Sequence, residues 1–290
     1  MNPGVLLSDD PHAHLRNLKT LPAVDAQLDA CIECGFCEPV CPSRDAATSP
    51  RQRIQLLRAV ARGETVADWT ARGVDPCAGD GLCATACPVG IDTGAAMRRQ
   101  RAHARGALTR HAAACTARHV ALVTGVARLA LRVYGGKRLP GTAIALPAAA
   151  RTPPRALTGD PTYLWFPTCI ARTLDSVADD LHALCAAAGI GLTLPDGWPT
   201  LCCGQPFSSK GFPDTDAQLR ARARAALGIG ADGSAPRAII TDTATCAAHL
   251  GLPVIDPATF AATVLAPRLG LPPTPAWLHP TCADTRHGWD

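Results

Sequence analysis

The residues best suited to chemistry are cysteines, of which this chain of 290 residues has 14. Four of them form the run Cys31-x2-Cys34-x2-Cys37-x3-Cys41, directly before Pro42. With this spacing, three thiolates on a tight loop hold one cubane iron–sulfur cluster, and the fourth turns away to ligate another. A zinc knuckle is the alternative, because zinc needs only four ligands and tolerates many spacings. The complete run favours iron–sulfur chemistry.

A second run keeps the same frame but has an acid at the second ligand position: Cys77-x2-Asp80-x2-Cys83-x3-Cys87, followed by a proline. Two matched runs predict crossed ligation. The first cluster takes Cys31, Cys34, Cys37 and Cys87, and the second takes Cys41, Cys77 and Cys83. The fourth iron of the second cluster is left to Asp80, a nearby group or water, or that cluster has only three irons. Alternatively, Asp80 only shapes a turn between two glycines.

A third set of cysteines lies further along the chain, at Cys169, Cys202, Cys203 and Cys246. Gly204 follows the adjacent pair, and its missing side chain lets the backbone and two sulfurs approach one centre. We therefore predict a metal ion or a third cluster in this region. The alternative is that cysteines of this set, such as Cys169 and Cys246, are small buried apolar residues.

The elements that position these residues divide at a Pro-rich stretch over residues 139–161, which cannot be a continuous helix. Before it we predict a mainly helical domain over residues 21–138. After it, β-like runs at 163–166, 237–241 and 276–279 alternate with Ala- and Leu-rich helical stretches. This alternation predicts an α/β domain with parallel strands over residues 162–290, and an α+β protein as a whole.

The clearest helix of the first domain begins at Pro50, a residue suited to a first helical turn. It places Ile54, Leu57 and Val60 near one face, and Gly63 ends it.

Two further cysteines are expected to be buried apolar residues without a ligand role. Cys185 lies on a helical face with Leu181 and Leu184, and Cys115 receives the same interpretation.

An internal repeat bears on the end of the chain. Residues 163–169 and 277–282 each read as a strand that runs into Pro-Thr-Cys. The second copy lacks the Cys-Cys-Gly, and the chain stops eight residues after Cys282, which leaves a strand without a covering helix. We therefore expect a truncated α/β domain with an incomplete second repeat.

The composition is that of an ordinary globular chain, with 47% apolar residues and a net charge of +4. At about 150 residues per domain, the length predicts two domains. The small basic excess and an aromatic content of 4% argue against a nucleic-acid partner. The acidic opening segment lacks the apolar stretch of a signal peptide. Clustered cysteines then indicate a reducing compartment, so we expect a cytoplasmic protein, with the inner face of the membrane as the alternative location.

Several segments together resemble one known family. They are residues 2–11, 31–44, 50–54 (Pro-Arg-Gln-Arg-Ile), 80–94 and 202–211 (Cys-Cys-Gly-Gln-Pro-Phe-Ser-Ser-Lys-Gly). These segments are similar to the C-terminal half of bacterial FAD-linked D-lactate dehydrogenases, and the likeness covers most of the chain. The cysteine-rich module is also similar to iron–sulfur subunits of heterodisulfide reductase, glycolate oxidase and anaerobic glycerol-3-phosphate dehydrogenase.

The resemblance implies a dicluster ferredoxin-like domain followed by a cysteine-rich (CCG) domain. In that family FAD removes hydride from a D-2-hydroxy acid, and the clusters pass electrons singly to a cytochrome or quinone. Residues 1–20 look like the tail of a flavin domain, so FAD belongs to a domain or flavoprotein partner that is not in this chain. No catalytic residue can be named here, and this chain alone is not expected to oxidise substrate.

Two alternatives stay open. The chain could be a stand-alone iron–sulfur subunit of a glycolate oxidase or of a complex like heterodisulfide reductase. Its second domain could also be a structural zinc module or a docking module.

The region between the first domain's cysteines and the Pro-rich stretch is basic and amphipathic. Its first part carries Arg98, Arg99, Arg101, Arg105, Arg110 and Arg118. These could face acidic lipid or a partner protein, but we favour a solvated helix face because arginine is frequent throughout the chain. Residues 120–133 are apolar but interrupted by Arg128 and Arg132, and fall short of the ~20 residues of a membrane span. We predict no membrane span and expect this helix to pack on its own domain or on the flavin domain.

Overall fold

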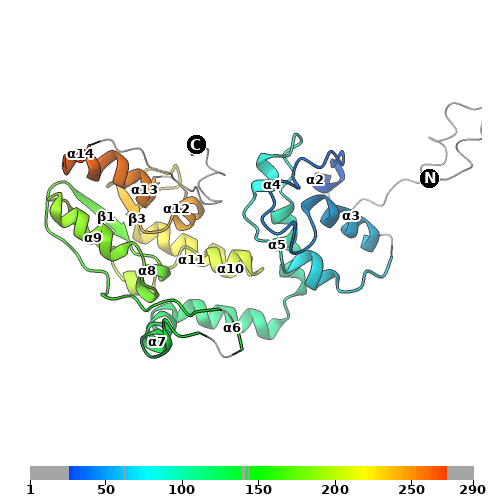
Figure 1. The fold of residues 1–290 in the computed structure, drawn as a ribbon, viewed down its shortest axis with the longest axis horizontal. Helices are drawn as coiled ribbons and strands as arrows, with labels where there is room; N and C mark the ends of the chain where they lie inside the picture. The colour runs from blue at the N-terminus through cyan, green and yellow to red at the C-terminus, as the bar shows by residue number, and fades with distance from the viewer. Residues whose placement is uncertain (1–25, 62, 139–140, 143, 252, 273–290) are drawn as a thin grey trace, which may run out of the picture. The chain divides into compact units, whose positions relative to one another are not determined.

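A computed structural model of the chain describes residues 26–61, 63–138, 141–142, 144–251 and 253–272 (Figure 1). The chain divides into two compact units, Met1–Met97 and Arg98–Asp290. The division falls inside helix α5 (Thr93–Ala104), well before the Pro-rich stretch in which we expected the domain boundary. The predicted flavin tail at 1–20, the strand at 276–279 and the repeat ending at Cys282 lie outside the described residues.

The first unit is helical. Its elements are α2 (Ala26–Asp29), α3 (Pro50–Ala61), the π-helical turn η2 (Thr70–Val74), α4 (Leu82–Thr85) and the start of α5. Ile54 and Leu57 of α3 are buried in its core with Met97, as the apolar spacing predicted. Val60, which was placed near the same face, is 41% exposed at the end of the helix. Gly63 has a φ of +83°, the left-handed conformation common after a helix end.

Helix α3 begins with a capping box. The side-chain oxygen Oε1 of Gln52 accepts a hydrogen bond from the backbone N–H of Ser49 (2.9 Å), and Ser49 Oγ accepts one from the N–H of Gln52 (3.3 Å). Pro50 stands at the first helical position, where its missing N–H costs nothing. This local arrangement fixes where α3 starts beside the first cysteine run.

The second unit holds the remaining elements. They are α6 (Ala107–Arg118), α7 (Val120–Tyr134), β1 (Thr162–Phe166), α8 (Cys169–Thr173), α9 (Ala178–Ala187), β2 (Gly191–Thr193), the 3₁₀ turn η3 (Trp198–Thr200), α10 (Gln205–Ser209), α11 (Pro213–Ala226), β3 (Ile239–Thr241), α12 (Ala244–Leu250), β4 (Val254–Ile255), α13 (Pro257–Phe260), the π-helical turn η4 (Ala261–Leu265) and α14 (Ala266–Arg268). Among the described residues, no helix has the length and apolar character needed to cross a membrane.

The four strands form one parallel sheet in the order β2-β1-β3-β4. Successive residues of β1 face opposite sides, so Phe166 packs with residues of α11 and α12, and Trp165 packs with residues of α9 and α13. The predicted strands at 163–166 and 237–241 correspond to β1 and the shorter β3. Strands β2 and β4 were not predicted, because runs of three and two residues carry too little pattern.

Helices α6 and α7 belong to the second unit, although they precede the Pro-rich stretch. Ala117 and Val120 share a buried cluster with Cys202 and Leu219. Arg128 of α7 donates hydrogen bonds to the backbone oxygens of residues 150 and 151, both at 3.1 Å. These contacts explain why the units divide in α5.

The two cysteines without an expected ligand role behave differently. Cys185 is fully buried on one face of the sheet, as predicted, although Leu184 beside it is 39% exposed. The expectation for Cys115 was wrong, because this thiol is only half-buried and lies 3.5 Å from Nε2 of His111, one helical turn earlier.

Candidate metal centres

Four cysteines from distant parts of the first unit line one small cavity. They are Cys31, Cys34, Cys37 and Cys87, the set that crossed ligation assigns to the first cluster. Ile54 and Ile91 are apolar residues of its wall. Cys34 is exposed, so this cavity reaches the surface of the unit.

A second cavity is lined by the other set. Cys41, Cys77 and Cys83 border it together with Asp80. Cys41 and Cys83 are buried. A fourth cysteine is replaced here by a carboxylate, as the sequence frame implied.

Salt bridges to α3 hold the loop of the first cysteine run. Glu33 and Gly35 have φ angles of +60° and +82°, so the backbone turns sharply between the cysteines. Nη1 of Arg58, a buried side chain, donates to Oε1 of Glu33 at 3.1 Å. Glu38 accepts from Ser49 Oγ (2.7 Å) and Arg51 Nε (3.1 Å), and these hydrogen bonds, Ser49 first, lower its pKa.

Helix N-termini donate to one sulfur of each run. The backbone N–H of Arg51 at the start of α3 hydrogen-bonds to Cys37, and those of Gly94 and Thr93 at the start of α5 hydrogen-bond to Cys83. Burial raises the pKa of Cys37 to about 11 and also raises that of Cys83, while the N–H donors oppose this. Both cysteines hold the third position of their run, and helix N-termini favour negative charge there.

A buried cation contacts the second cavity. Arg53 is 1% exposed, and its Nε donates to the backbone oxygen of Gly73 at 2.7 Å. Its Nη2 donates to Ser43 Oγ (3.0 Å), and its Nη1 lies 3.7 Å from the sulfur of Cys41. The guanidinium of Arg53 thus hydrogen-bonds to a sulfur that the sequence assigns to the second set.

Asp80 shapes the turn that begins α4. Its Oδ1 accepts a hydrogen bond from the backbone N–H of Leu82 at 3.0 Å, across Gly81 with a φ of +82°. The side chain also borders the cavity of the second set. The structure therefore shows that Asp80 shapes the turn, and its role as a ligand of the second cluster stays a prediction.

The second unit brings the third cysteine set together. Cys169 hydrogen-bonds to Cys202, Cys202 to Cys203, and the sulfurs of Cys203 and Cys246 are 3.0 Å apart. Cys169 opens α8 after β1, and Cys246 lies in α12 after β3. The thiols therefore gather at the carboxyl ends of two adjacent parallel strands, where α/β folds commonly bind ligands.

The four thiols of this set, Cys169, Cys202, Cys203 and Cys246, contact one another in a row, which we call the thiol chain, and do not surround a common centre. Across the described residues, no three His, Cys, Asp or Glu side chains are arranged to hold a single metal ion. Three of the four thiols, those of Cys202, Cys203 and Cys246, are buried.

Contacts between thiols, together with burial, raise the pKa values of Cys169, Cys202 and Cys203. The hydrogen bond to Cys202, then burial, raises the pKa of Cys169. The hydrogen bond from Cys169 lowers the pKa of Cys202, but the bond to Cys203 and burial together raise it to about 11. For Cys203, the bond to Cys202 lowers the pKa, while Cys246 and burial raise it well above the ordinary value. Without a bound metal, these groups are thiols at neutral pH.

A buried arginine and a buried aspartate flank the thiols. Arg172 donates to the backbone oxygens of Pro199 (2.6 Å) and Leu201 (2.6 Å), and burial lowers its pKa while the thiols and Asp242 oppose this. Asp242 accepts from the N–H (2.8 Å) and Oγ1 (2.6 Å) of Thr168. Burial raises the pKa of Asp242, and the Thr168 hydrogen bonds counteract it.

The glycine of Cys-Cys-Gly packs against an acid. Gly204 has a φ of +93°, and a Cβ there would lie 2.8 Å from the backbone oxygen of Asp216 and closer still to its Oδ1. The same Oδ1 lies 2.7 Å from Nε2 of His249, and both side chains are mostly buried. A side chain at position 204 would therefore displace this pair.

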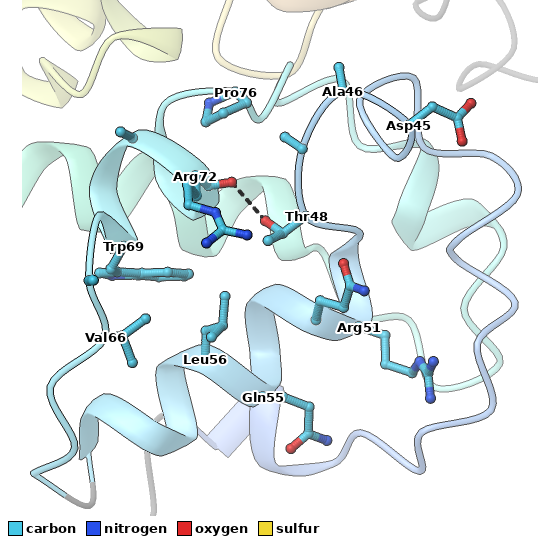
Figure 2. Close-up of a pocket in the computed structure, with 14 residues that line it drawn as sticks. Asp45, Ala46, Thr48, Arg51, Gln55, Leu56, Val66, Trp69, Arg72 and Pro76 are labelled. Carbon is cyan, nitrogen blue, oxygen red and sulfur yellow. Dashed lines mark hydrogen bonds between the residues drawn. The ribbon is translucent and has the colours of Figure 1, made fainter.

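Figure 2 shows a wider pocket of about 820 Å³ on the first unit, bordered by Thr48, Leu56, Trp69 and Arg72 among others. Thr48 Oγ1 donates to the backbone oxygen of Arg72 at 2.9 Å. The side chain of Arg51 points away from that of Arg72, so the two cations do not converge on one ligand (Figure 2). None of the described cysteines borders this pocket, and we assign it no chemistry.

Two family models match the chain. One, described as "4Fe-4S dicluster domain", matches residues 27–91, and the other, described as "Cysteine-rich domain", matches residues 163–251. The first match spans both cysteine runs, and the second spans the thiol chain. The protein therefore has a helical 4Fe–4S dicluster domain followed by a cysteine-rich domain with a small parallel sheet, which confirms the predicted fold class.

Part of the chain is similar to iron–sulfur subunits of glycolate oxidases. Over 80 residues it is 38% identical to the glycolate oxidase iron-sulfur subunit of Escherichia coli (strain K12). The aligned segment covers 26% of this chain and 19% of the relative. Over 83 residues it is 35% identical to the probable glycolate oxidase iron-sulfur subunit of Bacillus subtilis (strain 168). This second alignment covers 27% of this chain and 19% of the relative. The chain thus aligns with about a fifth of the length of these curated relatives. No solved structure matches it.

Several residues at these sites were not singled out from the sequence. Arg53, Arg58 and Arg172 read as ordinary helix arginines, yet all three are buried against cysteine-bearing loops or the thiol chain. The segment Pro-Arg-Gln-Arg-Ile was noted only as a helix start and a family likeness. One signal could have indicated the salt bridges. Three arginines of α3 follow a cysteine run that contains Glu33 and Glu38.

Proposed function

We propose that this chain is the electron-transfer part of an enzyme that oxidises a D-2-hydroxy acid, with D-lactate as the substrate. FAD is held by a separate domain or flavoprotein partner, and a cytochrome or quinone accepts the electrons. The observation that carries the proposal is the partition of seven cysteines and Asp80 into two cavities that follow crossed dicluster ligation. The dicluster match and the homology to oxidase subunits support it.

The residues present fit two clusters. Cys31, Cys34, Cys37 and Cys87 would hold one, and Cys41, Cys77 and Cys83, with Asp80 as a further ligand, would hold the other. Such clusters supply one-electron transfer. The chain's own part is to fix the thiolates and to stabilise negative charge, through the N–H groups at the starts of α3 and α5 and the guanidinium of Arg53.

We also propose a third centre at the thiol chain of the second unit. Four sulfurs in succession suit a multi-iron group better than one ion, and the Arg172 guanidinium lies close enough to interact electrostatically with Cys169 and Cys202. A structural zinc or docking module remains the competing proposal for this domain. Serine in place of both Cys202 and Cys203, in the full-length chain, separates the two: loss of iron and sulfide supports a third cluster, and loss of stoichiometric zinc supports the alternative.

A second candidate function is a free iron–sulfur subunit of a glycolate oxidase, which the names of the two relatives favour. The polypeptide that carries these residues, purified without oxygen from its own cell, distinguishes the candidates. An intact mass near 30.1 kDa indicates a free subunit, and a much larger mass indicates a fused flavoenzyme.

The same preparation tests the main proposal. After D-lactate is added, we expect bleaching of the visible absorption of the clusters and the appearance of EPR signals from reduced clusters. Reduction by glycolate but not by D-lactate would support the second candidate. Clusters that neither acid reduces, in a preparation that contains FAD, would contradict both.

A further inference from the structure

Basic charge is concentrated in one stretch of the chain. Residues 93–159 contain 12 Lys and Arg and no Asp or Glu, whereas the rest of the chain contains 16 basic and 24 acidic residues. Arginine is also frequent outside this stretch, with 14 residues, but there it is accompanied by acidic residues. Helices α6 and α7 lie within this acid-free stretch (Figure 1).

Helix α7 presents an apolar stripe to solvent. Its members are Leu122, Val126, Leu129 and Val133, which are 65%, 59%, 62% and 54% exposed. Their spacing of four, three and four residues places Leu at d positions and Val at a positions of two heptads. This is the pattern with which one helix packs along another in a two-stranded coiled coil.

The opposite face of α7 is fixed to its own unit. Val120 is buried with Ala117 and Cys202, and Arg128 is held by two backbone oxygens. The helix also contacts α8 and η3. The stripe is therefore the outward face of a helix that is anchored on the second unit and not on the first domain, where it was expected.

The charged residues around the stripe are basic, so a partner that covers the stripe should carry negative charge. Arg118 and Arg132 are exposed at its margins, and neither has a carboxylate partner among the residues that the structure describes. Lys137 and Arg138 follow the end of the helix and are also exposed. Burying the stripe against a neutral or basic surface would leave these cations unpaired or facing like charge.

We propose that the stripe of α7 is the docking site for an amphipathic helix of a partner protein that carries Asp or Glu beside its own apolar seam. A second copy of this chain fits poorly, because two acid-free segments would repel each other. A lipid surface needs neither a heptad register nor the small residues Gly125 and Ala130 that flank the stripe. The stripe also lacks Trp and Phe, which accompany Leu on the apolar face of interfacial helices. The proposal does not depend on the substrate or on the clusters.

A synthetic peptide serves as the probe. It has four heptads with Val at a, Leu at d and Glu at e and g, and a matched peptide has Lys at e and g. Fluorescence anisotropy of the labelled peptides is measured against the full chain, at low and high salt. We expect the Glu peptide to bind, the Lys peptide not to bind, and the affinity to fall as salt rises.

Two sets of variants locate the binding. Val126→Glu with Leu129→Glu should weaken Glu-peptide binding at least about tenfold, and Val177→Glu, a valine of similar exposure in the same unit, should leave it unchanged. Arg118→Glu with Arg132→Glu should reverse the preference toward the Lys peptide. All five substituted positions are exposed, so circular dichroism should report unchanged folding.

Three results would overturn the proposal. The first is equal binding of both peptides, or binding of neither. The second is co-sedimentation with phosphatidylserine vesicles that Val126→Glu with Leu129→Glu abolishes, in the absence of peptide binding, which would assign the stripe to lipid. The third is a concentration-dependent dimer that the same variant dissociates, which would assign it to a second copy.

Discussion

The two units treat their cysteines in opposite ways. In the first unit, seven cysteines border two separate cavities, and helix N-termini and Arg53 already point positive charge at the sulfurs. In the second unit, four thiols contact each other, and the nearby guanidinium of Arg172 donates its hydrogen bonds to backbone oxygens. The first arrangement is prepared for bound negative groups. In the second, Cys169, Cys202 and Cys203 have raised pKa values and must lose their protons before they can bind a metal.

Crossed ligation in the first unit predicts the largest effect. Cys87→Ser should remove the cluster of the first run, and Cys41→Ser should remove that of the second, although each residue belongs to the other run. Quantitative EPR and iron analysis of anaerobically reconstituted protein should show the loss of one EPR signal and of roughly the three or four irons of one cluster in each case. Loss of the cluster of its own run in either variant would contradict the crossed arrangement.

Asp80→Cys tests the carboxylate that distinguishes the second cavity. If Asp80 is a ligand, or if the second cluster has three irons, a fourth thiolate should change the EPR spectrum of that cluster and raise its iron content by up to about one atom. Asp80→Asn is the matched control, because its side-chain oxygen still accepts from Leu82. If the EPR spectrum of Asp80→Cys equals that of wild type, Asp80 is not a cluster ligand and only shapes the turn before α4.

The buried arginine of the second unit should matter for stability. Arg172→Met leaves several backbone oxygens without donors, and we expect a loss of about 3 kcal/mol in the free energy of unfolding. Denaturant unfolding of the metal-free chain measures it. Arg151→Met, which removes an exposed arginine that pairs with Asp175, should change little. Similar values for both variants would argue against a structural role for Arg172.

The buried arginine of the first unit should instead matter for redox potential. Arg53→Met removes a positive charge beside Cys41, which disfavours the reduced state and should lower the potential of the second cluster by roughly 60 mV, a tenfold change in a one-electron equilibrium. EPR-monitored redox titration gives the value, with the first cluster as an internal control and Arg53→Lys as partial rescue. Equal shifts in both clusters would show that Arg53 acts through the fold and not through the sulfur.

The sequence predicted the parts of the sites that local spacing determines. Each cysteine run is a short segment, so its frame identified the two sets that line the two cavities. Pro50, which predicted the start of α3, likewise acts within one helical turn. The exposure of Val60 could not be predicted, because helical spacing gives the face of a residue but not how far its neighbours cover the helix.

Contacts between distant segments could not be predicted in this way. Asp242 meets Thr168 across 74 residues, and Arg172 reaches the backbone of residues 198–201, so neither pairing has a local signal. Helices α6 and α7 were placed with the wrong neighbours for the same reason. Their helical pattern is local, whereas the burial of Val120 against Leu219 depends on the fold.

The close approach of Gly204 to Asp216 has a consequence for the history of this fold. Because the backbone of the Cys-Cys-Gly segment lies where any side chain would strike the aspartate, the glycine can change only if the residue facing it also changes. The two positions should therefore vary together among related chains, and His249, which is bound to the same carboxylate, should vary with them.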